Sequence, residues 1–220
     1  SLAFFRALGN RAGIASPLTN LGDLAGRQGK HELARQFLAE ALEIHKQIGN
    51  RAGVAGTLAG LGSLARLQGH YDEARERFIE SLAISKEIDY RAGIAMGLED
   101  LALVARFQGD YNEARARLLE ILTIARELGD QNEVAETLLN LGALERVQGH
   151  YETARQYLDE GLKLNRASGN RKGIALSLDN LGDVALALGA YEEARQRYLS
   201  SLEIYREYDD RAGIVISLSG

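Results

Sequence analysis

Arginine side chains recur along the sequence at a fixed spacing, and they are the groups best suited to bind a ligand. One row, in which the residues are 40 positions apart, consists of Arg66, Arg106 and Arg146. Each guanidinium can donate two parallel hydrogen bonds to a carboxylate or bind a backbone carbonyl. The same side chains can instead be solvated and pair with acidic residues of the chain, for which the candidates are Glu99, Asp100 and Glu136. The sequence leaves both interpretations open.

No arrangement of residues indicates a catalytic, cofactor or metal site. His31 and His45 are too far apart along one predicted helix to coordinate the same ion, and His70 and His150 are far apart in the sequence at turn positions. The chain contains no cysteine, which excludes a disulfide, a zinc thiolate site and a thiol nucleophile. No phosphate-binding Gly loop and no nucleophile beside a base is visible. We therefore expect a protein that is not an enzyme and holds no cofactor or metal.

Charge and hydropathy restrict the classes of partner. Lys and Arg number 26 against 31 Asp and Glu, for a net charge of -5, so the release of counterions that drives nucleic-acid binding is missing. The longest apolar stretches are interrupted by charged residues well before the roughly 20 residues of a membrane span. No charged and then apolar leader opens the chain. We expect a soluble protein, cytoplasmic by default, without nucleic-acid or membrane partners.

The sequence repeats itself every 40 residues without an insertion, and this period must position the groups named above. It aligns a leucine column, Leu21, Leu61, Leu101, Leu141 and Leu181, and a glycine column, Gly29, Gly69, Gly109, Gly149 and Gly189. Within the second repeat, Val54, Leu58 and Leu61 follow one another at helical steps, as do Tyr71, Ala74, Phe78 and Leu82. The period predicts an all-α solenoid of antiparallel helix pairs.

Turn and capping residues predict where each helix begins and ends. Gly69 suits a left-handed residue at the end of a first helix, and Asp110 with Glu113 predicts a capping box. Gly49-Asn50 marks the other turn, and Asp130 with Glu133 repeats the capping pattern.

The repeat also predicts the organisation of the chain. We expect one array over residues 1–220 with five full repeats, 10–49, 50–89, 90–129, 130–169 and 170–209. Residues 1–9 would end a preceding second helix and 210–220 would begin a further first helix, which suggests a segment of a longer array. The apolar ends, Leu2, Phe4, Phe5 and Leu8 with Ile214, Val215, Ile216 and Leu218, could pair head to tail between molecules.

Several columns are interpreted as structural. Four glycines, Gly22, Gly62, Gly142 and Gly182, follow the leucine column and are expected to let the two helices of a repeat pack backbone against backbone, with wider packing at Ala102. The arginines of the second helices, Arg35, Arg75, Arg115, Arg155 and Arg195, are expected to cover the seam between repeats. The tyrosines Tyr71, Tyr111, Tyr151 and Tyr191 are expected mainly to pack. Pro17 should start its helix near Ser16 or kink it.

The pattern Leu61-Gly62, Gly69, Tyr71, Ala74, Phe78 and Leu82 resembles the tetratricopeptide repeat, and the similarity covers essentially the whole chain. The unit is longer than the usual repeat of about 34 residues and lacks its closing proline, which predicts longer helices. Arrays of this length are similar to the sensor arrays of bacterial signalling ATPases and transcription regulators and to the peptide-binding arrays of kinesin light chains and spindle-orientation adaptors. The resemblance implies a right-handed superhelix whose first helices line a concave groove that binds proteins or peptides.

The faces of the first helices opposite the core columns are the candidate groove. The candidate residues are Asn20, Asp23, Arg66, Met96, Glu99, Asp100, Leu103, Arg106, Phe107, Leu139, Asn140, Arg146, Asp179, Asn180 and Asp183. In related arrays an Asn in the column of Asn20, Asn140 and Asn180 holds the backbone of an extended ligand, although Gly60 and Asp100 interrupt this column. Three functions are weighed: a protein or peptide scaffold, a sensor region of a larger regulator, and a self-assembling array.

Overall fold

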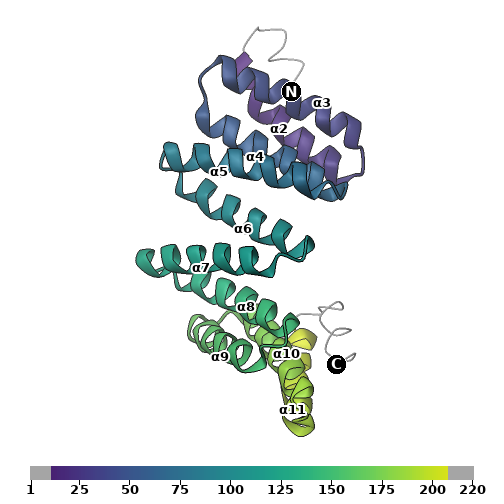
Figure 1. Ribbon diagram of the computed structural model, residues 1–220, viewed down its shortest axis with the longest axis vertical. Coiled ribbons are helices and arrows are strands. Elements are labelled where there is room, and N and C mark those ends of the chain that lie inside the picture. The colour runs from purple at the N-terminus through teal and green to yellow at the C-terminus, as the bar shows by residue number, and fades with distance from the viewer. Residues whose placement is uncertain (1–10, 208–220) are drawn as a thin grey trace. The chain divides into compact units, whose positions relative to one another are not determined.

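The computed structural model describes residues 11–207, and every regular element in this range is an α-helix (Figure 1). The helices are α2 (Arg11–Arg27), α3 (His31–Gln47), α4 (Arg51–Leu67), α5 (Tyr71–Glu87), α6 (Arg91–Phe107), α7 (Tyr111–Leu128), α8 (Gln131–Val147), α9 (Tyr151–Ser168), α10 (Arg171–Ala187) and α11 (Tyr191–Glu207). Each predicted repeat holds two of them, which confirms the all-α solenoid of antiparallel helix pairs. The apolar residues expected to pair head to tail lie outside the described residues.

The chain forms two compact units, residues 1–117 and 118–220, with the boundary inside α7. Within each unit, a first helix packs on the second helix of its own repeat, and that second helix packs on the next first helix. First helices also touch one another, α2 with α4, α4 with α6 and α8 with α10, whereas α3 with α5 and α9 with α11 make far less contact. The first helices therefore form the tighter, inner layer of each unit.

Glycine and capping residues end and start the helices as predicted. Gly69 and Gly49 have φ of 77° and 69°, in the left-handed region that favours glycine. The carboxylate of Asp110 accepts a hydrogen bond from the Glu113 amide, and Asp130 accepts from the Asn132 and Glu133 amides. Asn50 caps α4 through the Gly53 amide. These local signals fix the helix bounds.

The glycines after the leucine column let the paired helix approach closely. An added Cβ at Gly62 would lie 2.7 Å from the Phe78 ring, and one at Gly142 would lie 2.5 Å from Leu158. The added Cβ would also lie 3.2 Å from the Ala154 carbonyl oxygen at Gly142 and 3.3 Å from the Ala34 carbonyl oxygen at Gly22. The expected backbone approach to the alanine column is therefore present at these two glycines, although the nearest contact is the large side chain one turn beyond the alanine. The wider packing expected at Ala102 stays a prediction.

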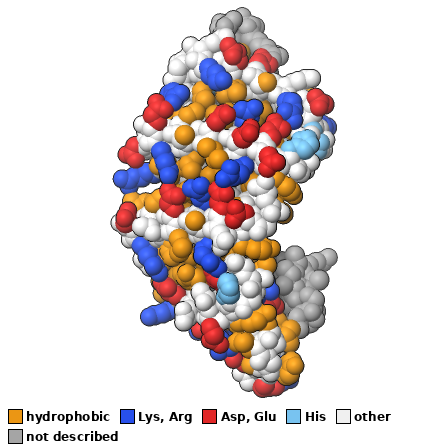
Figure 2. Space-filling view, viewed as in Figure 1, with side chains coloured by type: hydrophobic (Ala, Val, Ile, Leu, Met, Phe, Trp, Pro, Cys, Tyr) orange, Lys and Arg blue, Asp and Glu red, His pale blue; other side chains and the backbone are white. Residues whose placement is uncertain are grey.

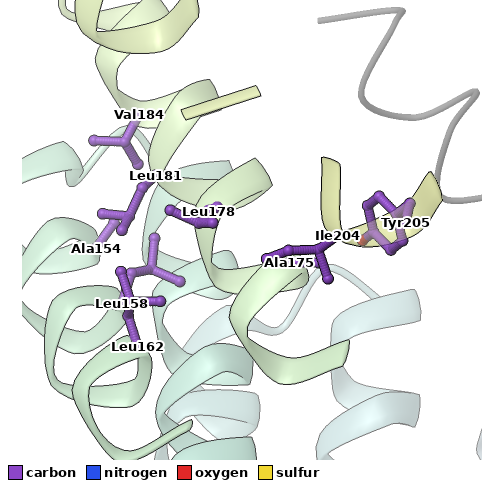
Figure 3. Packing of buried hydrophobic residues seen from close by; sticks show 9 residues of the cluster. All are labelled: Ala154, Leu158, Leu162, Ala175, Leu178, Leu181, Val184, Ile204 and Tyr205. Carbon is purple, nitrogen blue, oxygen red and sulfur yellow. The ribbon is translucent and has the colours of Figure 1, made fainter. Parts of the chain in front are cut away.

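Leucines, alanines and valines of successive helices fill the core between the layers. In the second unit, one cluster joins α9, α10 and α11 through Ala154, Leu158, Leu162, Ala175, Leu178, Leu181, Val184, Ile204 and Tyr205 (Figure 3). Leu158 and Val184 are fully buried, and Leu181 is 2% exposed. Burial of these side chains on neighbouring repeats is what makes each repeat depend on the next.

Three arginines of the second-helix column bridge adjacent repeats, whereas Arg195 pairs with Glu192 of its own helix. Arg35 pairs with Glu73, Arg75 with Glu113 and Arg155 with Glu193, at nitrogen to oxygen distances of 3.4, 3.0 and 3.5 Å. All six side chains are partly exposed, so each pair contributes only modestly to stability. This geometry agrees with the structural role expected for the column and adds the glutamate partners, which sequence inspection did not identify.

Two other local expectations are corrected. Helix α2 begins at Arg11, so a helix start near Ser16 is wrong, and Pro17 lies inside the helix; a kink there stays a prediction. Tyr71, Tyr111 and Tyr151 are half-buried, but Tyr191 is 71% exposed and does not pack like the others.

Candidate functional site

The inner faces of the first helices in the first unit combine exposed charges with exposed apolar side chains. Asn20, Asp23, Glu99 and Arg106 are exposed, as are Met96 and Phe107, whereas Arg66, Asp100 and Leu103 are half-buried. On the molecular face seen in Figure 2, basic and acidic side chains are interspersed with hydrophobic ones. The candidate surface in this unit can therefore contact both polar and apolar groups.

Asp100 and Arg66 form an incompletely satisfied pair of opposite charges on α6 and α4. Burial raises the pKa of Asp100 to about 6, and the positive charge of Arg66 counteracts only part of this effect. The Arg66 Nε is buried and has no hydrogen-bond partner. Because this Nε is buried, it is not itself accessible to a ligand.

Phe107 and Arg106 occupy the last turn of α6. The Phe107 ring stacks on Tyr71 with 5.5 Å between centroids and 6° between planes, yet it remains 51% exposed. Arg106 is exposed and forms no ion pair with the part of the chain that the structure describes. For Arg106 the interpretation as an internally paired side chain is therefore not supported.

In the second unit the third arginine of the row is engaged internally. Arg146 on α8 lies 3.2 Å from the carboxylate of Asp183 on α10, and the Tyr198 hydroxyl donates to the same carboxylate at 2.7 Å. Burial and the neighbouring carboxylate raise the pKa of Tyr198 well above its ordinary value, which keeps the phenol protonated and donating. Arg146 therefore forms an ion pair within the array, as the second interpretation of the arginine row predicted. Its partner, Asp183, is not one of the predicted acids Glu99, Asp100 and Glu136.

Asp179 does not belong to an open surface. It is 5% exposed, and its carboxylate accepts a hydrogen bond of 3.0 Å from the Tyr205 hydroxyl on α11. Its expected exposure in the groove is wrong, because a tyrosine of the second helix reaches through to it. Asn180 is half-buried and donates to the Leu176 carbonyl of its own helix, while Leu139 is half-buried and Asn140 is exposed.

These tyrosine contacts had a signal in the sequence. Tyr198 stands where the other repeats carry Leu38, Phe78, Leu118 and Leu158, and the fifth repeat is also the one with both Asp179 and Asp183 on its first helix. A hydroxyl that replaces Leu or Phe on the second helix, in the one repeat whose first helix carries both carboxylates, would have predicted the pairing. A second missed contact joins the buried Glu145 to His150, whose Nδ1 lies 2.8 Å from the carboxylate.

Over residues 11–207, no group of three or more His, Asp or Glu side chains is arranged to hold a metal ion. Within the same range, no helix combines the length and the hydropathy needed to cross a bilayer.

The sequence of this array of helix pairs matches a known repeat family. The tetratricopeptide repeat model matches residues 5–87, 93–167 and 133–207, which together span most of the chain. The chain belongs to the tetratricopeptide repeat family. The tetratricopeptide fold is typically a scaffold for protein interactions, and this chain has that architecture. No curated protein matches the sequence.

Solved tetratricopeptide structures share the fold at low sequence identity. BtubC (BKLC) from P. vanneervenii is 20% identical with a TM-score of 0.84, covering 95% of this chain and 88% of that one. The Rap conjugation gene regulator of plasmid pLS20, in complex with the Phr* peptide, is 21% identical with a TM-score of 0.65, covering 86% and 52%. The STAND protein PH0952 from Pyrococcus horikoshii, which has a tetratricopeptide repeat sensor, is 20% identical with a TM-score of 0.77, covering 91% and 32%.

Proposed function

We propose that this tetratricopeptide array binds an extended segment of a protein or peptide on the inner faces of its first helices. The observation that carries the proposal is the contrast between the two sides of α6. Leu98, Leu101 and Val104 are buried in the core, while Met96 and Phe107 are 56% and 51% exposed. Large exposed apolar side chains beside an exposed cation, here Arg106, are typical of a protein-binding surface.

The proposed contacts follow from the hydrogen-bonding groups left on this surface. In the first unit, Arg106 can donate to a ligand carbonyl or carboxylate, and Met96 and Phe107 can cover an apolar side chain. The related Rap regulator was crystallised with the Phr* peptide, which supports a peptide as the class of ligand.

The test is selection of a random peptide library on the immobilised protein, followed by affinity measurements on one selected peptide. Arg106→Ala and Met96→Ala, both in the first unit, should each weaken binding by about tenfold, which corresponds to about 1.4 kcal/mol, without lowering the melting temperature. Glu76→Ala, at an exposed position on the second helix α5, is the matched control and should bind normally. Loss of stability with unchanged affinity would overturn the inner-face assignment.

A second candidate is a sensor region within a larger signalling protein. The similarity to PH0952 favours it, because this chain covers only 32% of that protein, whose structure is described as having a tetratricopeptide repeat sensor. The deciding observation is the full gene: a neighbouring nucleotide-binding or DNA-binding domain supports the sensor, and a freestanding array supports the scaffold. Head-to-tail assembly stays untested, and light scattering over a range of concentrations would test it.

A further inference from the structure

A cavity of about 390 Å³ opens in the first unit between α3, α4 and α5. It shares no residue with the inner-face site. Its apolar lining comes from Val54 and Leu58 on α4 and from Ala83 and Ile84 on α5. Its polar lining comes from the last turn of α3, the first residue of α4 and Glu80 on α5. A volume of several hundred cubic ångströms with an apolar wall and a few polar groups is typical of sites for small organic ligands.

His45 is the polar group at the buried side of this cavity. Its side chain is 2% exposed, and its Nδ1 packs against Gly53, where an added Cβ would lie 2.2 Å away. The imidazole makes no hydrogen bond to the residues that the structure describes. The Nδ1 is enclosed against Gly53, so a ligand in the cavity would contact another edge of the ring, and the imidazole would report its charge.

The matching position in the second unit shows how the chain otherwise satisfies this place. There Asn165 replaces His45, and its Oδ1 accepts a hydrogen bond of 3.0 Å from Asn170. Glu203 occupies the position of Ala83, so a longer side chain stands on that wall. In the first unit, by contrast, the His45 Nδ1 has no hydrogen-bond partner and the wall of the cavity carries the small side chain of Ala83.

The charges around the cavity favour an anion. Lys46 lines it and forms no ion pair with any described residue. Arg51 is the first residue of α4, so the positive N-terminal end of that helix also borders the cavity. The acidic lining residue, Glu80, pairs with Arg77 at 3.5 Å, and Arg51 is itself paired with Glu87.

We propose that this cavity binds a small hydrophobic carboxylate, with its apolar body against Val54, Leu58 and Ile84 and its carboxylate facing His45, Lys46 and the start of α4. Such a ligand matches the two ends of the cavity, one apolar and one cationic. The site would let the array respond to a small acid independently of a partner bound to the inner face.

The experiment is NMR titration of the full chain with 3-phenylpropionate, with 3-phenylpropan-1-ol as the uncharged arm. Binding of the carboxylate should shift the His45 ring resonances and raise the pKa of His45, because a nearby anion stabilises the imidazolium. The alcohol should bind at least about tenfold more weakly, since it lacks the charge that Lys46 attracts. Equal shifts with the acid and the alcohol would contradict the claim that the cavity prefers a carboxylate.

Two variants and a control complete the test. Ala83→Glu, which copies the residue of the fifth repeat, should abolish binding by filling the cavity and repelling the anion, and Lys46→Ala should weaken it. Ala39→Asp adds an acid at an exposed position on α3 that does not line the cavity and should leave the titration unchanged. An absence of His45 shifts at millimolar acid, or shifts that persist in Ala83→Glu, would refute the site. Neither result depends on whether the inner face binds a peptide.

Discussion

At the scale of single residues, one column of the repeat holds buried polar side chains that differ in every unit. His45, Ser85, Asn165 and Tyr205 are all nearly inaccessible, although they occupy equivalent positions. Three of them face a glycine, since an added Cβ at Gly53, Gly93 or Gly173 would collide with the side chain opposite. Where the column holds Ala125, the matching position carries Glu133 instead. A buried polar side chain before the turn is thus opposite a glycine after it, and the small Ala125 is matched by the larger Glu133.

The buried imidazole in this column should make stability depend on pH. Burial lowers the pKa of His45 below its ordinary value of 6.5, so the unfolded chain binds a proton more readily than the folded one. The free energy of unfolding should therefore fall as the pH drops through 6.5 toward the lower folded-state pKa, and level off below it. His45→Asn should remove this component, because Asn50 can then bond it as Asn170 bonds Asn165.

Urea unfolding at about pH 7.5 and about pH 5.5 measures the effect as the difference between wild type and variant. His70→Asn, which replaces an exposed histidine, is the control and should keep the wild-type dependence. An unchanged dependence in His45→Asn would show that the imidazole is not desolvated in the folded protein.

At the scale of the helices, two glycines of α4 differ in their surroundings: Gly62 packs against another side chain, and Gly56 does not. Replacing each by alanine separates the cost of a steric clash from the gain in helix propensity. Gly62→Ala should destabilise the protein, because the new methyl group meets the fully buried Phe78 ring at 2.7 Å and overpacking of about 1–3 kcal/mol exceeds the helix gain of about 1 kcal/mol. Gly56→Ala meets no atom within 4 Å and should stabilise by up to about 1 kcal/mol. Thermal unfolding of both variants compares the two effects within one helix, and equal signs would contradict the packing role.

Among the described residues, the turn after α5 is the one in which a residue other than glycine has a positive φ. Asp89 has φ of 51°, whereas Gly49 in the matching turn has φ of 69°. Asp89→Gly should raise the free energy of unfolding by about 0.5–1 kcal/mol, since a side chain in the left-handed region is strained. Gly49→Asp is the reciprocal variant and should lower it. Denaturant unfolding of the two measures both changes, and a stabilising Gly49→Asp would show that the turn conformation does not limit stability.

At the scale of the molecule, stability should be distributed along the array, because each repeat buries its apolar side chains mainly against its neighbours. Leu181→Ala opens the core cluster of the second unit and should cost about 2–5 kcal/mol. Amide hydrogen exchange should accelerate most in α8 to α11 and least in α2 and α3. Uniform acceleration over the whole chain would mean that the array unfolds as one cooperative body.

The sequence by itself determined the repeat, the helix pairs, the turn glycines and the caps. These features depend on spacings of three, four and 40 residues and on short-range backbone chemistry, so they can be read without a fold. The periodicity of one helical face also indicated residues that the structure exposes, namely Asn20, Asp23, Met96, Glu99, Arg106, Phe107 and Asn140; their role in binding stays a prediction.

Only the tertiary structure decided which of those candidates are available to a partner. Asp179 is covered by Tyr205, and Arg146 is held by Asp183. The structure also decided that His45, which is not an inner-face candidate, lies beside a cavity with its Nδ1 unbonded. Each outcome depends on how far a side chain of one helix reaches toward a residue of another. Side-chain reach across a helix interface is set by packing in three dimensions, and a periodic pattern along the chain does not contain it.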